Sequence, residues 1–192
     1  MKYKATFQEE YLLTSNLLGA ETIEELEQLE KVAFYIAEGL IEGEGFEFLF
    51  PLTIKSIKLL HKKLFGSIYS FAGEFREVSL MKDETRFCES QYININLKDL
   101  FDKFNSENEW SDIKIATERL AYFKTEINMI HPFREGNGRT IRIIVREMAR
   151  KKGFDWRTEL LDRESYLNAM RKSSFDERPL IIVFENTLFP IH

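Results

Sequence analysis

The sequence predicts a mainly α-helical fold with one short β-hairpin. Most of the chain repeats apolar residues at steps of three and four, a spacing that places them on one face of a helix. The stretch REVSLMKDETRFCE, residues 76–89, instead alternates apolar and polar residues on both sides of a charged turn, which is typical of a hairpin. Only four prolines are present and no repeat or low-complexity linker is visible, so we expect one domain over residues 1–192.

The first long helix is expected at residues 21–40, after an N-terminal arm of about 20 residues. Thr22 is placed as its N-cap, and Glu25 three residues later completes a capping box. The glycines of EGLIEGEGF, residues 38–46, are expected to end it. An apolar stripe runs along the helix and consists of Ile23, Leu26, Leu29, Ala33, Ile36 and Leu40.

Further helices follow on both sides of the hairpin. The stretch LTIKSIKLLHKKLFG, residues 52–66, forms the second, with Gly66 as its stop. Residues 92–104 and 112–130 return to helical spacing after the hairpin, and residues 140–153 and 162–174 continue it before an apolar tail. The helix at 112–130 has one face expected to be buried: Ala116, Leu120, Phe123, Ile127 and Ile130.

The chemistry-bearing residue types gather in HPFREGNGRTIR, residues 131–142. Pro132 disfavours helical geometry at the residue before it, so the preceding helix is expected to end near Met129. The next helix is expected to begin near Arg139 or Thr140. Between them, EGNG tolerates left-handed backbone and the close approach of a ligand. A glycine-rich turn that leads into a helix start points backbone N–H groups at one place, which suits a phosphate.

Four side chains of this loop fit the same site. Arg139 and Arg142 are three residues apart, so they share a helix face and can both reach a polyphosphate. Glu135 offers a hard oxygen ligand, and magnesium needs only one or two carboxylates when substrate phosphates complete its coordination. His131 supplies a general base that works near neutral pH. Together they favour attack on a magnesium-bound nucleotide.

The loop resembles the signature of the Fic family, HxFx(D/E)GNGRxxR, and matches it at every specified position. The resemblance extends upstream, because LHKKLFGSIYSFAGEFREV at 60–78 is similar to the family's helix and its F/W-A-G-x-x-R segment. SNLLG at 15–19 resembles stand-alone bacterial Fic toxins. Matching landmarks run from about residue 16 to residue 142, followed by helices as expected.

The resemblance implies a Fic-type helical bundle that transfers AMP from ATP to a Tyr, Ser or Thr hydroxyl of a target protein. By position, His131 and Arg139 would be catalytic, and Glu135 would hold Mg²⁺. Phe133 would be the buried anchor of the loop. The nucleotide would be bound by the motif residues Gly136, Asn137, Gly138, Arg139 and Arg142, with Arg139 at the β-phosphate and Arg142 at the γ-phosphate.

In the family, a hairpin called the flap aligns a target segment by strand pairing. The resemblance assigns this role to about residues 76–90, next to the motif loop at 131–142, with Lys82, Asp83 and Glu84 at the tip. Phe87 and Cys88 are interpreted as filler under the hairpin. His61 is interpreted as structural.

Two alternatives stay open: a nucleotide-binding module without turnover, and a Fic enzyme that uses another nucleotide such as UTP or GTP. Relatives that transfer phosphate carry Lys in place of the second glycine, where this chain has Gly138. Relatives that transfer phosphocholine tend to have Ala where Gly136 stands. Both differences favour AMP transfer.

Composition excludes several other classes. The net charge is −5 and the pI about 5.4, so the chain lacks the broad basic surface that non-specific nucleic-acid binding needs. No apolar run reaches the length of a membrane span. Cys88 is the single cysteine, which excludes an intrachain disulfide. We expect a bacterial cytoplasmic protein without nucleic acid or membrane as a direct partner.

Regulation is expected to come from another chain. Many Fic proteins carry an inhibitory (S/T)xxxE(G/N) motif whose Glu pairs with the second motif arginine, here Arg142. Outside the motif loop, none of the five Glu-Gly or Glu-Asn pairs has Ser or Thr four residues before the Glu. The resemblance therefore implies a toxin restrained by a small helical antitoxin; a degenerate internal inhibitor such as FYIAEG at 34–39 is the alternative. Similar bacterial toxins suggest a type II topoisomerase as target, although no residue here specifies it.

Overall fold

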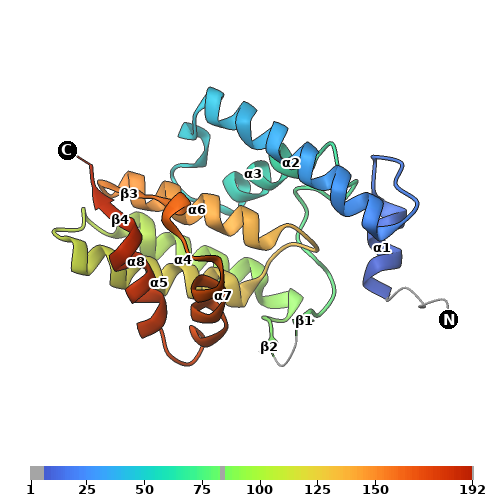
Figure 1. Cartoon of the computed structure of the whole chain (residues 1–192). Coiled ribbons are helices and arrows are strands. Elements are labelled where there is room, and N and C mark those ends of the chain that lie inside the picture. Colours follow the sequence, from blue (N-terminus) through green and yellow to red (C-terminus); the bar gives the residue numbers. More distant parts are fainter. Residues whose placement is uncertain (1–6, 83–84, 192) are drawn as a thin grey trace. The chain divides into compact units, whose positions relative to one another are not determined.

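The computed structural model describes residues 7–82 and 85–191, and confirms a mainly helical chain with a short hairpin (Figure 1). The described helices are α1 (Phe7–Ser15), α2 (Ile23–Glu44), α3 (Ile54–Phe65), α4 (Ile93–Ser106), α5 (Ile113–Ile130), α6 (Asn137–Lys151), α7 (Arg163–Lys172) and α8 (Arg178–Thr187). Short 3-10 turns lie at Glu47–Leu49, Ser90–Tyr92 and Thr158–Leu160. Among the described residues, none of the helices combines the length and the apolar composition that a membrane span requires.

Two small antiparallel sheets accompany the helices. The predicted hairpin is formed by β1 (Met81–Lys82) and β2 (Thr85–Arg86), with Met81 opposite Arg86. The second sheet pairs β3 (Phe154–Trp156) with β4 (Leu188–Pro190) and was not predicted from sequence. Its central pair, Asp155 opposite Phe189, is 34 residues apart along the chain, so only tertiary packing brings the two strands together.

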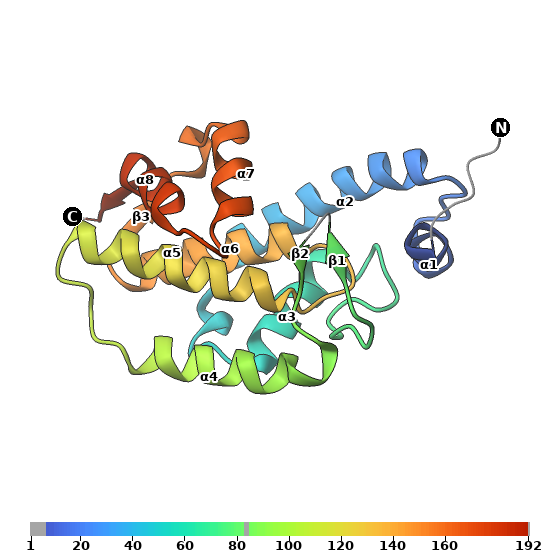
Figure 2. The ribbon, with the colours of Figure 1, turned by 90° about the horizontal axis from the view of Figure 1, so that it is seen from below.

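The chain forms two compact units. The first comprises residues 1–75 and 133–136, and the second comprises residues 76–132 and 137–192. In the first unit, α2 packs on α3, with the rings of Phe34 and Phe65 5.5 Å apart. In the second, α5 packs on α6 and on α8, and Figure 2 shows α4 running along α5. The motif loop therefore contributes Phe133–Gly136 to one unit and its remaining residues to the other.

The helix caps follow the local sequence. Thr22 caps α2 by accepting a hydrogen bond from the Glu25 N–H at 3.2 Å, as predicted. The predicted capping box is wrong in its second half, because the Glu25 carboxylate accepts from the Glu21 N–H at 3.0 Å and not from Thr22. Thr53 and Ser56 form a reciprocal capping box at the start of α3. The α2 helix continues four residues beyond the predicted end, through Gly43, and stops at Gly45, whose φ of +89° suits glycine.

The buried faces follow the sequence pattern in α5 but not in α2. Every residue of the predicted α5 face is buried, from Ala116 to Ile130. In α2 the buried side chains are Leu26, Phe34 and Ile41. The predicted stripe members Leu29, Ile36 and Leu40 are exposed, because apolar residues occur on more than one side of this helix and packing decides which side is covered.

Candidate active site

The α5 helix ends one residue later than expected, at Ile130, and His131 is its C-cap. His131 adopts the left-handed conformation, with φ +48° and ψ +62°, and its N–H still bonds to the Ile127 carbonyl at 3.0 Å. It is the one residue other than glycine with positive φ among the described residues. The following proline explains why the helix stops here, since it disfavours helical geometry at His131. His131 therefore lies at the end of α5 with its backbone in a sparsely populated conformation.

Two neighbours orient the His131 ring. Its Nδ1 lies 3.2 Å from the Asn128 carbonyl oxygen. Because a carbonyl only accepts, this contact places the proton on Nδ1 and leaves the lone pair on Nε2. The Phe87 ring stacks on the imidazole, with centroids 3.8 Å apart and planes 12° from parallel. Phe87, interpreted above as filler, is thus a direct neighbour of His131.

Arg76 ties the end of α5 to the foot of the hairpin. It is 4% exposed, and its own N–H donates to the Pro132 carbonyl at 2.9 Å. The guanidinium donates to four backbone carbonyls: His131 (2.7 Å), Val78 (2.5 Å), Ile130 (3.1 Å) and Cys88. A fifth link joins the same parts directly, from the Cys88 N–H to the Met129 carbonyl at 2.9 Å. One planar, multi-donor side chain therefore holds the backbone around His131.

Within the first unit, Phe133 is fully buried against His61, whose ring lies parallel to it with centroids 3.8 Å apart. His61 is itself fully buried: its Nδ1 accepts from the Gly73 N–H at 2.9 Å, and its Nε2 lies 3.0 Å from the Glu135 carbonyl. Since Nδ1 accepts, Nε2 carries the proton and donates. His61 thus has a structural role, because it contacts both Phe133 and the Glu135 carbonyl of the loop.

The turn before α6 depends on Gly136, which has φ +77°. A Cβ atom built there would lie 2.5 Å from Cζ of Phe65, so this position has no room for a side chain. The Gly136 N–H donates to Oε1 of Glu135 at 2.8 Å. One of the predicted anion-binding amides is therefore bonded to a carboxylate.

The α6 helix begins at Asn137, two to three residues earlier than the expected start near Arg139 or Thr140. The reversal at Gly136 lets Asn137 and Gly138 enter the helix, so their N–H groups belong to its first turn, at the positive end of the dipole. Asn137 is 3% exposed, and Arg139 and Arg142 are half-buried. Arg142 forms no ion pair within the ranges that the structure describes.

The predicted flap residues are only partly described. Lys82 belongs to β1, and the backbone of Thr85 pairs with it. Asp83 and Glu84 lie outside the described residues.

For a metal, the described parts of the chain contain no group of three His, Cys, Asp or Glu that could hold an ion. Glu135 is thus a single carboxylate, a donor set that fits Mg²⁺ only together with substrate phosphates.

A family model, that of the Fic/DOC family, matches residues 51–149, more than half of the chain. The chain belongs to the Fic/DOC family. Among its Fic relatives, protein adenylyltransferase VbhT of Bartonella schoenbuchensis is 31% identical over 170 residues, covering 86% of this chain and 35% of the relative. Probable protein adenylyltransferase y4lH of Sinorhizobium fredii is 32% identical over 162 residues, 81% of each chain. This chain thus spans about a third of the length of the Bartonella relative.

The Fic fold is also found by structural comparison. The crystal structure of BepC from Bartonella tribocorum, with bound AMPPNP, superimposes with a TM-score of 0.83 and covers 98% of this chain and all of the other. The two sequences are 19% identical, so this likeness shows the fold. It confirms the fold that the motif resemblance implied.

Arg76 was not predicted as a site residue, although the sequence contains a motif that includes it. It is the last residue of the Fic segment FAGEFR, at 71–76, which was identified above without a role for the arginine. Nothing in the sequence indicated the contact of Phe87 with His131, since an apolar residue in an alternating stretch is typical of packing under a hairpin.

The Gly136 turn of this Fic loop leads to a stability prediction. Gly136→Ala is expected to lower the free energy of unfolding by about 2–4 kcal/mol, from the left-handed φ and the overlap with the Phe65 ring. Adding Phe65→Leu should recover the part due to overlap, which a double-mutant cycle in urea measures. Gly138→Ala is the matched control, because a Cβ atom added at this helical position would meet no atom within 4 Å. Equal losses for both alanines would contradict the assignment.

Proposed function

We propose that this chain transfers AMP from ATP to a hydroxyl group of a target protein. The observation that carries the proposal is the state of His131: its Nδ1 is held by the Asn128 carbonyl, so Nε2 keeps a lone pair for a proton. The sequence places this base six residues before α6, whose first turn contains the motif glycine and Arg139. The names of the two relatives given above, protein adenylyltransferase VbhT and probable protein adenylyltransferase y4lH, support the same proposal.

In the proposed reaction, Nε2 of His131 takes the proton of the target hydroxyl as its oxygen attacks the α-phosphorus. The bond from that phosphorus to the oxygen bridging to the β-phosphate breaks, and pyrophosphate leaves with the electron pair. The product is AMP joined to the target through a phosphodiester bond. In-line attack needs the nucleophile opposite the leaving group, so the protein's task is mainly to position the groups and to stabilise charge.

The phosphates are assigned to α6 and the turn before it. Backbone N–H groups of Gly136, Asn137 and Gly138 would line the anion hole, assisted by the Asn137 side chain. Arg139 would neutralise the β-phosphate and Arg142 the γ-phosphate. Because Oε1 of Glu135 now accepts from Gly136, phosphate binding would displace this carboxylate from the amide. Phe133 is the proposed anchor, supported by its complete burial on His61.

Glu135 would hold Mg²⁺ together with the α- and β-phosphates. When bound, the metal neutralises charge on the phosphates and helps to orient them. Released from Gly136, the Glu135 carboxylate would be the one protein ligand, consistent with the absence of a three-residue metal cluster in the described ranges.

The flap at β1–β2 would hold an extended target segment by strand pairing, a role that the motif resemblance assigns to Lys82, Asp83 and Glu84. A small helical antitoxin would restrain the enzyme by presenting a Glu to Arg142. This is supported by the lack of an ion pair of Arg142 with any described residue. We place the reaction in the bacterial cytoplasm, with a type II topoisomerase as the first target to test.

The test compares ATP labelled at the α- or γ-phosphate, incubated with Mg²⁺, the purified chain and bacterial lysate. We expect protein-bound label from the α-labelled ATP alone, with mass spectrometry locating AMP on Tyr, Ser or Thr. Chelation of Mg²⁺ should abolish it. Arg142→Ala should weaken ATP use, whereas Arg163→Ala at the start of α7 is a control outside the motif. Label from UTP or GTP in preference to ATP would assign another nucleotide. Nucleotide binding without any transfer would make the chain a binding module.

A further inference from the structure

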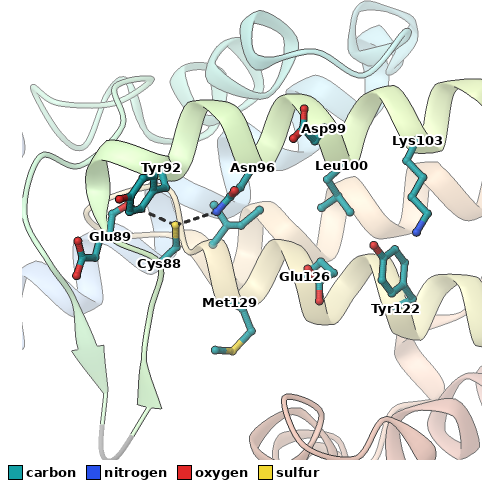
Figure 3. A pocket seen from close by; sticks show the side chains of 11 residues that line it. Cys88, Glu89, Tyr92, Asn96, Asp99, Leu100, Lys103, Tyr122, Glu126 and Met129 are labelled. Carbon is teal, nitrogen blue, oxygen red and sulfur yellow. Dashed lines mark hydrogen bonds between the residues drawn. The ribbon is translucent and has the colours of Figure 1, made fainter.

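A pocket of about 580 Å³ lies between α4 and α5, within the second unit (Figure 3). None of the motif residues 131–142 lines it. Its walls combine three carboxylates, Glu89, Asp99 and Glu126, with the rings of Tyr92 and Tyr122. Tyr92 is 51% exposed, so the pocket opens to solvent, which suits a side chain of a passing polypeptide better than an enclosed small molecule.

The pocket adjoins both the foot of the flap hairpin and the end of α5 that carries His131. Cys88 and Glu89 line its near end and directly follow Phe87, whose ring stacks on His131. On the α5 side, Met129 and Ile130 line it and directly precede His131. Figure 3 shows the foot of the hairpin at this end of the pocket, with Glu89 and Cys88 beside Tyr92. A segment that leaves the flap at β2 therefore meets the pocket next.

The pocket carries an excess of negative charge. Its single lysine, Lys103, rests with Nζ 4.1 Å from the centre of the Tyr122 ring. Glu89 is paired with Arg86 at 2.8 Å, whereas Asp99 and Glu126 form no ion pair within the described ranges. The charge of Glu126 also acts outside the pocket: burial, and then the charge of Glu126, raise the pKa of Glu177, the N-cap residue of α8, and Arg119 partly offsets this. Asp99 and Glu126 against the single Lys103 leave a net negative charge, which favours a cationic ligand.

We propose that this pocket receives an Arg or Lys side chain of the target protein, close in sequence to the modified hydroxyl. Asp99 and Glu126 would pair with the cation, and the Tyr92 ring would flank it. An extended segment advances about 3.3 Å per residue, so the basic residue lies within a few positions of the hydroxyl placed at His131. The inference rests on the proposed AMP transfer and adds a substrate preference to it.

The test uses Tyr-centred peptides of eleven residues in which one Arg is moved through the flanking positions. Matched peptides carry citrulline, which has nearly the same shape without the charge. We expect one position at which Arg raises kcat/KM for AMP transfer about fivefold over citrulline. Glu126→Gln should remove that ratio. Glu118→Gln is the control, because it removes the same charge from an exposed position of α5 outside the pocket.

A second measurement does not depend on turnover. Fluorescence anisotropy of the labelled Arg peptide, without ATP, should show tighter binding than the citrulline peptide for the parent chain and for Glu118→Gln, but not for Glu126→Gln. If neither peptide is modified while this difference persists, the proposed reaction fails and the pocket stands. If the Arg and citrulline peptides have equal kcat/KM at every position and bind equally tightly, the pocket assignment is overturned. A dimer that Glu126→Gln dissociates, seen by sedimentation, would assign it to a second copy instead.

Discussion

His131→Ala is expected to lower the rate constant of AMP transfer by a factor of about 10²–10⁴, the usual contribution of a positioned general base. The reason lies in the tautomer: the Asn128 carbonyl holds the Nδ1 proton, so Nε2 is the atom that accepts the hydroxyl proton. Transfer of label from α-labelled ATP under saturating nucleotide measures the effect. The affinity for ATP, measured by calorimetry, should change little, because the phosphates are assigned to other residues.

Phe87→Leu is expected to lower the same rate constant by a smaller factor. It keeps the base but removes the ring that stacks 3.8 Å from the imidazole, so we expect a smaller loss, of about tenfold or less, from looser orientation. A transfer rate for His131→Ala equal to that of the parent chain would contradict the role of His131. A loss of ATP affinity as large as the loss of rate would instead indicate a collapsed loop.

Arg76→Ala is expected to have the largest effect on stability, lowering the free energy of unfolding by about 3–5 kcal/mol. The guanidinium is buried and donates to the carbonyls of Val78, Cys88, Ile130 and His131, which would lose their donor together. Urea denaturation measures the loss. Transfer activity should fall with it, because the same contacts hold the backbone of His131.

Two variants keep this prediction testable if Arg76→Ala fails to fold. Arg76→Lys retains the charge but replaces a planar five-donor group by a single ammonium, so it should fold with an intermediate loss and reduced transfer. Arg86→Lys is the matched control on β2, where the side chain is 69% exposed and pairs with Glu89; a change within about 0.5 kcal/mol is expected. Full transfer by Arg76→Lys would show that the guanidinium does not position His131.

The sequence alone determined those features that depend on neighbouring residues. The helix cap at Thr22, the end of α5 before Pro132, and the buried face of α5 follow from short-range hydrogen bonding and periodicity. The motif at 131–142 identified the family for the same reason, since its residues are contiguous. The start of α6 was predicted two to three residues late, because the effect of one left-handed glycine on the turn is not visible in composition.

Only the tertiary structure decided what joins distant parts of the chain. Arg76 reaches carbonyls more than fifty residues away, β3 meets β4 across thirty-four residues, and the buried side of α2 depends on which helix packs there. The pocket between α4 and α5 likewise gathers Glu89, Asp99 and Glu126 from separate segments. The physical reason is that burial and long-range hydrogen bonds depend on which surfaces meet, whereas caps, turns and periodic faces depend on residues a few positions apart.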